Sequence, residues 1–164
     1  MNYIYSQSSS EVKNRTYGKY KASYNGCGPV CLYNLLVLLE RNVPFDIVIR
    51  VLEKHLWFGG LFGTFSGNMK KALEHFGCPY KSVKAESVNA ITGERKIFVA
   101  HMNNGFMFFK GRHWVLFVTE RDGKVTAFTG SKKDRPSEYS SFNDFCERYI
   151  RVGHGSIHRL YMIE

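Results

Sequence analysis

The segment from Val30 to Leu39 constrains the fold more than any other part of the chain, because its side chains are apolar nearly all the way round. This pattern predicts a helix over about Gly28 to Arg41, and Pro29 suits its first turn, where a missing backbone N–H costs nothing. A helix with almost no polar face is buried in the middle of a domain. We therefore expect the other elements to enclose this helix.

Helical patterns continue for a short distance after this segment. Apolar positions predict a second helix from about Pro44 to Leu56 and a third from about Asn68 to Phe76, where Gly77 gives a fitting C-terminal stop. The glycine-rich stretch Gly59–Gly67 is typical of a loop. The first half of the chain is therefore predicted to be helical.

The second half changes to the alternating pattern of strands. Asp122-Gly123 predicts a hairpin, and Ser141 followed by Asp144 is typical of a capping box at the start of a short helix over about Phe142 to Tyr149. Helices first and a mostly antiparallel sheet second indicate an α+β fold. The predicted strands are Tyr80–Val83, Lys96–Met102, His113–Thr119, Val125–Thr129 and Ile157–Ile163.

The length of 164 residues favours a single domain. We expect residues 24–164 to form it and residues 1–23 to be an N-terminal arm, either loose or laid across the domain. No run reaches the roughly 18 apolar residues of a membrane helix, and the N-terminus lacks the apolar core of a signal peptide. We therefore expect no membrane span and a cytoplasmic protein, with a secreted mature form as the alternative.

The net charge of +9 fits an acidic partner such as nucleic acid, a cell wall polymer or a membrane surface. Because the Lys and Arg residues are scattered, we favour a solvated basic surface. No nucleic-acid recognition motif accompanies the charge, which disfavours a nucleic acid as the partner.

The cysteines lack the paired spacing of a zinc site, and the chain is too long to need disulfides for stability. We expect no metal and no cofactor. Cys31, Cys78 and Cys146 are expected to pack as small hydrophobic residues. The four cysteines are Cys27, Cys31, Cys78 and Cys146.

Cys27 differs from the others because it lies between Gly26 and Gly28 at the start of the apolar helix. The unpaired N–H groups and positive dipole end of a helix start favour the thiolate and lower its pKa. The glycines permit close approach of a substrate, and the Cys27 N–H can point at a developing oxyanion. A buried structural cysteine is the alternative, and these features favour a nucleophile.

A thiol nucleophile needs a base. His113 follows a loop and opens an apolar run, so we expect it at the edge of a cleft between the helical half and the sheet half. His101, on the neighbouring predicted strand, is its competitor. The alternative to a catalytic base at His113 is a histidine with a purely structural role.

Two motifs together resemble those of the papain-like cysteine peptidases. Within this family, the resemblance is to the double-glycine leader peptidases, which process bacteriocins, and to the stand-alone relatives of these peptidases. The motifs are Asn25-Gly26-Cys27-Gly28-Pro29 before a helix, and His113-Trp114-Val115-Leu116-Phe117-Val118 followed by a turn and Val125–Phe128. The resemblance covers residues 20 to 163 in order of elements. It implies a papain-like α+β fold, with Cys27 on a buried central helix and His113 on the sheet. It also implies thiol attack on a peptide or amide carbonyl through an acyl-enzyme.

Two positions depart from the family's pattern. The family usually carries a glutamine six residues before the cysteine as an oxyanion donor; Lys21 holds this position, and Asn25 is the nearest replacement amide. The family also usually places an Asp or Asn after the next strand to orient the histidine. Thr129 holds this position and can hydrogen-bond an imidazole, but it carries no charge. The predicted catalytic residues are Cys27, His113, Asn25 and Thr129.

The sequence thus predicts a cysteine peptidase or amidase acting on a peptide or protein substrate. One alternative is a weak or inactive papain-like domain that serves as a basic binding module, because Lys21 and Thr129 leave activity open. A second is an acyl transferase that uses the same Cys–His dyad. Gly59–Gly67 and Phe106–Phe109 are predicted either to shape a substrate groove or to be a plain loop and core strand.

Overall fold

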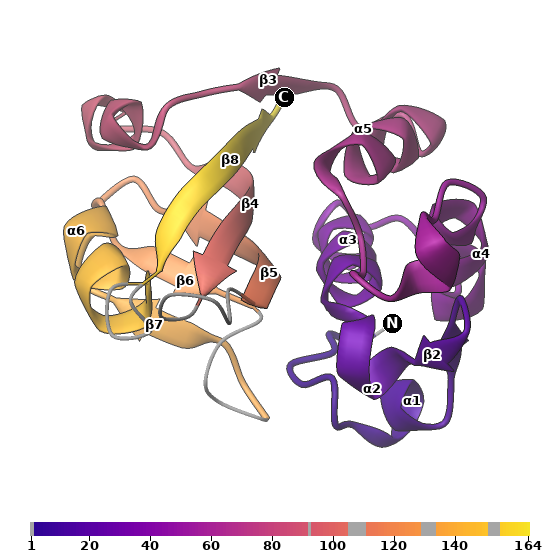
Figure 1. Cartoon of the computed structure of the whole chain (residues 1–164). Coiled ribbons are helices and arrows are strands. Elements are labelled where there is room, and N and C mark those ends of the chain that lie inside the picture. The colour runs from indigo at the N-terminus through magenta and orange to yellow at the C-terminus, as the bar shows by residue number, and fades with distance from the viewer. Residues whose placement is uncertain (1, 92, 105–110, 129–133, 151–154) are drawn as a thin grey trace.

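A helical half and a sheet half lie side by side in this computed structural model (Figure 1). The structure describes residues 2–91, 93–104, 111–128, 134–150 and 155–164. The helical half is formed by the N-terminal part of the chain and the sheet half by the rest. This arrangement confirms the predicted α+β fold.

The apolar helix is α3 (Cys27–Leu38), and it is buried from Cys27 to Leu36 as predicted. Helix α4 (Phe45–Glu53) and helix α5 (Ser66–His75) pack against it. Between these two helices the chain makes a short 3-10 turn, η1 (Phe58–Gly60), within the predicted glycine-rich loop. No helix within the described ranges is long and apolar enough to cross a bilayer.

The sheet has six strands in the order β3-β8-β4-β5-β6-β7, and every described pairing is antiparallel. The predicted hairpin joins β5 to β6, and Gly123 supplies the left-handed turn residue with φ of 84°. One strand, β7, was not predicted. The strands are β3 (Tyr80–Ser82), β4 (Lys96–Asn104), β5 (Gly111–Thr119), β6 (Val125–Ala127), β7 (Ser137–Tyr139) and β8 (Ser156–Ile163).

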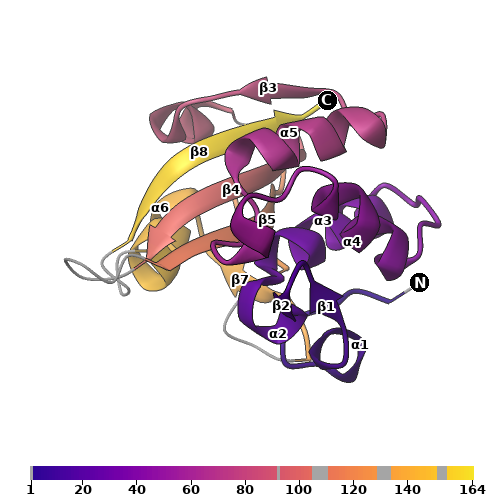
Figure 2. The same cartoon turned by 45° about the vertical axis from the view of Figure 1, so that its right-hand side comes forward.

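The sheet has a core on each face. Figures 1 and 2 show helices on both sides of the sheet. Helices α3 and α5 cover one face, with α4 packed against these two helices, and Trp114, Leu116 and Val118 of β5 face α3. The intervening residues Val115 and Phe117 belong to the second core, together with the 3-10 turn η2 (Ala85–Ala90), helix α6 (Phe142–Phe145) and its π-helical extension Cys146–Ile150. The predicted cap of α6 is present, because the Asp144 N–H donates to the Ser141 hydroxyl at 3.1 Å.

The N-terminal residues are folded onto the helical half. They contain helix α1 (Ser10–Lys13), the hairpin of β1 (Thr16–Tyr17) and β2 (Tyr20–Lys21), and helix α2 (Ala22–Asn25). Ile4, Val12 and Tyr17 are buried in the same core as α3. Residues 2–23 therefore contribute to the core of the helical half, and the predicted boundary between an arm and a domain at residue 24 stays a prediction.

Candidate active site

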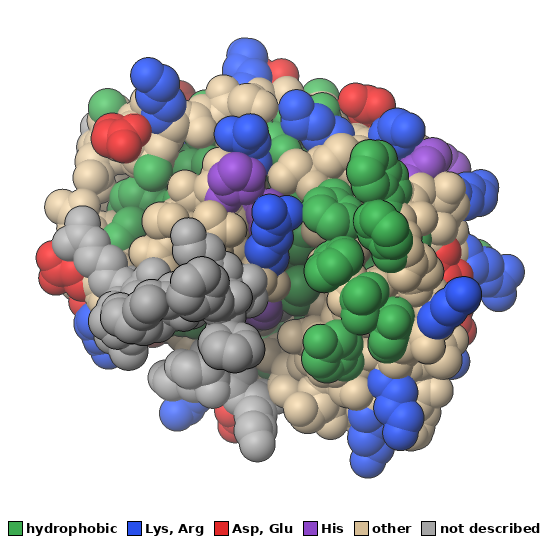
Figure 3. Space-filling view, viewed as in Figure 1, with side chains coloured by type: hydrophobic (Ala, Val, Ile, Leu, Met, Phe, Trp, Pro, Cys, Tyr) green, Lys and Arg blue, Asp and Glu red, His purple; other side chains and the backbone are tan. Residues whose placement is uncertain are grey.

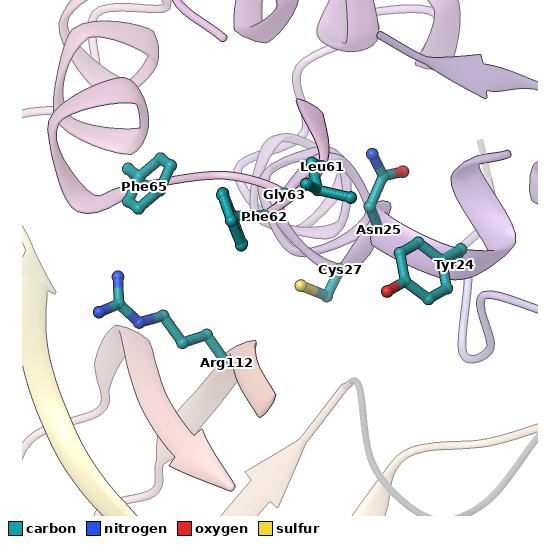
Figure 4. A pocket seen from close by; sticks show the side chains of 8 residues that line it. All are labelled: Tyr24, Asn25, Cys27, Leu61, Phe62, Gly63, Phe65 and Arg112. Carbon is teal, nitrogen blue, oxygen red and sulfur yellow. The ribbon is translucent and has the colours of Figure 1, made fainter. Parts of the chain in front are cut away.

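Cys27 is the first residue of α3 and follows α2 after a single glycine, Gly26. Its side chain is only 8% exposed, yet it lines a cavity of about 640 Å³ between the two halves. Figure 4 shows the sulfur directed into this cavity. The other residues that line it are Tyr24, Asn25, Leu61, Phe62, Gly63, Phe65 and Arg112.

The electrostatics of Cys27 differ from the sequence-based expectation. Burial raises the pKa of its thiol, and hydrogen bonds from the backbone N–H groups of Trp114, Gly28 and Cys27 itself oppose this effect without cancelling it. The predicted lowering of the pKa by the helix start is therefore wrong for this structure, because desolvation outweighs the helix N–H groups.

The hydrogen bond from Trp114 places the thiol beside β5, one residue from His113. Backbone N–H groups lie in the plane of a sheet, so the sulfur is at the edge of the strand. His113 is half-buried and pairs with Met102 of β4, which belongs to the core on the α6 side. By strand alternation the His113 side chain starts toward that face and has to reach around the strand edge to meet the sulfur. The predicted Cys27–His113 dyad stays a prediction.

His101, the competing histidine, is a core residue. Its ring is 1% exposed and stacks on Trp114 with centroids 4.4 Å apart, while its Nδ1 lies 3.1 Å from the Ser66 hydroxyl. Burial lowers the pKa of His101 to about 4, helped by the nearby Arg112, His158, Arg159 and His113. The imidazole of His101 is therefore neutral at pH 7.

Asn25 lines the cavity, but its amide serves the fold. Its Nδ2 donates to the Tyr17 carbonyl at 3.0 Å and to the Gly60 carbonyl at 2.7 Å. Both amide hydrogens are therefore used to tie the glycine-rich loop to the N-terminal hairpin. This arrangement disfavours the oxyanion role that the sequence suggested for Asn25.

A different amide, that of Gln7, meets the backbone of Cys27. Oriented by its hydrogen-bond partners, its side-chain oxygen accepts from the Cys27 N–H at 2.9 Å and from the Gly26 N–H at 3.1 Å. Sequence reasoning missed Gln7 because 20 residues separate it from Cys27 and no local motif links them. Lys21, at the family's glutamine position, is an exposed residue that precedes α2.

Thr64 fixes the walls of the cavity. Its hydroxyl bonds the Tyr17 hydroxyl at 2.8 Å, and its carbonyl accepts from the Trp114 indole N–H at 2.7 Å. A Cβ added at Gly28 would lie 2.0 Å from the Thr64 hydroxyl oxygen, so only glycine fits there. The loop is thereby held against both α3 and β5.

The remaining sequence-based residues contribute little to the described site. Thr129, predicted to orient the histidine, and Phe106–Phe109 lie outside the described residues. Among the residues that are described, no group of three His, Cys, Asp or Glu side chains is placed to hold a metal ion. The other cysteines are free thiols, with Cys31 and Cys78 buried and Cys146 half-buried.

Comparison with known proteins identifies the fold. No protein-family model and no curated protein sequence matches the chain. The structure is similar to the crystal structure of the peptidase domain of Streptococcus ComA, a bi-functional ABC transporter involved in a quorum sensing pathway. The TM-score is 0.53 and the identity 14%, over 85% of this chain and 90% of that one. The protein has a papain-like fold. The similarity confirms the resemblance inferred from the sequence at the level of fold.

Proposed function

We propose that this protein is a cysteine peptidase that cleaves a peptide or amide bond through an acyl-enzyme. The observation that supports this proposal most directly is the position of Cys27 at the start of the buried helix. Its sulfur lies in the cavity and accepts a hydrogen bond from the backbone N–H of Trp114, the residue that follows His113. The similarity to the ComA peptidase domain supports this choice within the papain-like fold.

In this mechanism His113 removes the thiol proton, and the sulfur of Cys27 attacks the substrate carbonyl carbon. The C–N bond breaks as the imidazolium gives its proton to the leaving amine. A water molecule, deprotonated by His113, then attacks the thioester, and the C–S bond breaks to restore the thiol. Thr129 remains the residue predicted to orient His113.

Gln7 takes the place of the family's oxyanion glutamine in this proposal. Its amide already lies 2.9 Å from the Cys27 N–H. We expect the substrate oxygen to displace the amide oxygen of Gln7, after which the turned amide donates one hydrogen bond and the Cys27 N–H a second. Two such donors stabilise the charge that develops on the carbonyl oxygen.

The experiment combines thiol labelling with turnover. Because His113 removes the thiol proton in this mechanism, we expect iodoacetamide at neutral pH to label Cys27 faster than the half-buried Cys146, as mapped by mass spectrometry. Against a pool of fluorogenic peptide amides, Cys27→Ser should abolish turnover. His113→Gln should lower it by about 10²- to 10⁴-fold.

Cys146→Ser serves as the matched control and should retain wild-type turnover. The proposal is contradicted if Cys27 is labelled no faster than Cys146 and no peptide is cleaved. Turnover that survives Cys27→Ser would contradict it equally, because the nucleophile would then be another group.

A further inference from the structure

Large apolar side chains gather beside the cavity, and Tyr24, Leu61, Phe62 and Phe65 among them line it. We call Tyr24, Trp57, Phe58, Leu61, Phe62 and Phe65 the aromatic wall. Phe58 and Phe62 have ring centroids 6.0 Å apart, Phe62 and Phe65 6.4 Å, and Trp57 and Phe65 6.1 Å, so these four rings form one continuous surface. Figure 3 shows hydrophobic side chains gathered on this part of the molecule. An exposed apolar patch of this kind marks an interaction site.

The aromatic wall is held rigidly in its exposed position. The Lys19 N–H donates to the Gly59 carbonyl at 2.8 Å, in addition to the bonds from Asn25 to Gly60 and from Trp114 to Thr64. Phe58 has a left-handed backbone with φ of 51°, which is strained for an aromatic residue, and its ring is 75% exposed. Strain that keeps an aromatic ring in solvent points to a functional surface.

A cation faces the aromatic wall across the cavity. The Arg112 guanidinium lies 5.7 Å from the centroid of the Phe65 ring, and Figure 4 shows it at the rim of the cavity. Within the described part of the chain Arg112 has no carboxylate in an ion pair, and no acidic residue lines the cavity. Arg159 adds positive charge nearby, since it acts on His101 together with Arg112.

We propose that the cavity binds an extended peptide segment in which a carboxylate lies next to bulky apolar side chains. The carboxylate pairs with Arg112, whose fork of N–H groups matches its geometry. The apolar side chains lie on the aromatic wall, and a cavity of about 640 Å³ has room for such a segment. This inference rests on the proposed function in that it places the cleaved bond at Cys27.

The test measures binding apart from catalysis, in the Cys27→Ser variant. Trp57 is 66% exposed and Trp114 is 1% exposed, so intrinsic fluorescence reports on the aromatic wall, and Trp57→Phe verifies the source of the signal. The probes are acetylated, amidated hexapeptides that contain a leucine pair beside Glu, Gln or Lys. A free-acid form of the Gln peptide distinguishes a terminal carboxylate from a side-chain carboxylate. Vesicles of phosphatidylcholine and phosphatidylglycerol test a lipid surface.

We expect the Glu peptide to bind about tenfold more tightly than the Gln peptide, the effect of one charge-assisted pair. Arg112→Gln should remove this preference, and Arg112→Glu should reverse it in favour of the Lys peptide. The exposed Arg121 supplies the matched control, and Arg121→Gln should keep the wild-type preference. Replacing the leucine pair by serines should weaken binding in every variant. Tight binding of the free-acid Gln peptide would assign the carboxylate to a chain terminus and support the same chemistry.

Equal binding of the Glu and Gln peptides overturns the inference, as does the absence of saturable binding by any peptide. Partition onto the vesicles without a peptide preference also overturns it, because the aromatic wall would then be a membrane surface. Arg112-dependent binding without cleavage by the wild-type protein would remove the proposed function and leave this inference intact. Cleavage without a preference for the Glu peptide would leave the proposed function intact and overturn this inference.

Discussion

At the scale of a single residue, the Cys27 thiol is under two opposing influences. Burial raises its pKa, whereas the backbone N–H groups of Trp114, Gly28 and Cys27 lower it. Burial prevails, so the thiol is protonated at neutral pH in this structure. A reactive thiolate therefore needs either the His113 base or a substrate that reorganises the cavity, and the head of a helix alone does not supply it.

Gln7 offers a way to separate a structural contact from an oxyanion donor. Gln7→Glu keeps an oxygen acceptor for the N–H groups of Cys27 and Gly26 but has no N–H to donate. We expect it to unfold near the wild-type temperature and to lose about 10²- to 10³-fold in kcat, with KM little changed. Gln7→Ala is the comparison, because it loses the acceptor as well and should cost about 1 to 2 kcal/mol of stability. An undiminished kcat in Gln7→Glu would refute the assignment.

His101 makes the stability depend on pH. Its pKa is lowered from 6.5 to about 4 in the folded state, so protonation opposes folding. Stability that is fully present above pH 6.5 should fall as the pH drops toward 4, by roughly 3 kcal/mol from this residue. Urea unfolding of His101→Gln should show a correspondingly flatter pH profile. His75→Gln, at an exposed site, should leave the profile unchanged.

At the scale of an element, α3 and α5 end by the same device. Glu40 follows α3 with φ of 56°, and the N–H groups of Glu40 and Arg41 bond the carbonyls of Val37 and Leu36. Gly77 follows α5 with φ of 60°, and the N–H groups of Gly77 and Cys78 bond Glu74 and Leu73 in the same pattern. Glycine is the residue that this left-handed position favours.

Exchanging glutamate and glycine at these two helix ends should change the free energy of unfolding in opposite directions. Glu40→Gly should raise the free energy of unfolding by about 1 kcal/mol, because it removes the strain of a Cβ at positive φ. Gly77→Glu should lower it by about the same amount. Chemical denaturation measures both, and Gly67→Ala is a control for glycine inside α5, where an added Cβ meets no atom within 4 Å. A loss of stability in Glu40→Gly would contradict this account.

The same helix ends show what the sequence could and could not predict. Gly77 marked the end of the third helix correctly, whereas Glu40 carries no such signal, and the predicted helix ran on to Arg41 instead of ending at Leu38. Periodicity predicted α3, α4, α5 and the strands β3, β4, β5, β6 and β8. It missed α1, α2, β1, β2 and β7, because segments of two to four residues contain too little periodicity to detect.

The candidate site was predictable only in its local parts. Cys27 at a helix head was visible in the sequence because its flanking glycines and the apolar helix are contiguous with it. The hydrogen bond from Trp114 and the approach of Gln7 arise from packing between segments far apart in the chain. Desolvation of the thiol is likewise a tertiary property, which is why the direction of its pKa shift was predicted wrongly.

At the scale of the whole molecule, the cavity depends on a third segment besides the helical and sheet halves. The N-terminal residues reach Cys27 through Gln7, and they are fastened to the middle of α3 by Asn34. The Asn34 side chain is fully buried, accepts from the Ile4 N–H at 2.8 Å and donates to the Ile4 carbonyl at 2.7 Å. These two hydrogen bonds to a polar side chain of an apolar helix hold the start of the chain in one position.

Asn34→Leu should therefore disturb the active site from a distance. It keeps the branched shape of the side chain but leaves the buried N–H and C=O of Ile4 without partners, which costs about 3 kcal/mol. We expect a lower urea midpoint and faster trypsin cleavage after Lys13 and Arg15. Turnover should also fall, because the released segment takes Gln7 away from the Cys27 N–H. Asn89→Leu, which breaks an exposed Asn–Asn hydrogen bond with Asn143, should change none of these by a comparable amount. If Asn34→Leu loses stability but cleavage of the N-terminal segment is not accelerated, other contacts hold Gln7, and the segment is not a separate part of the site.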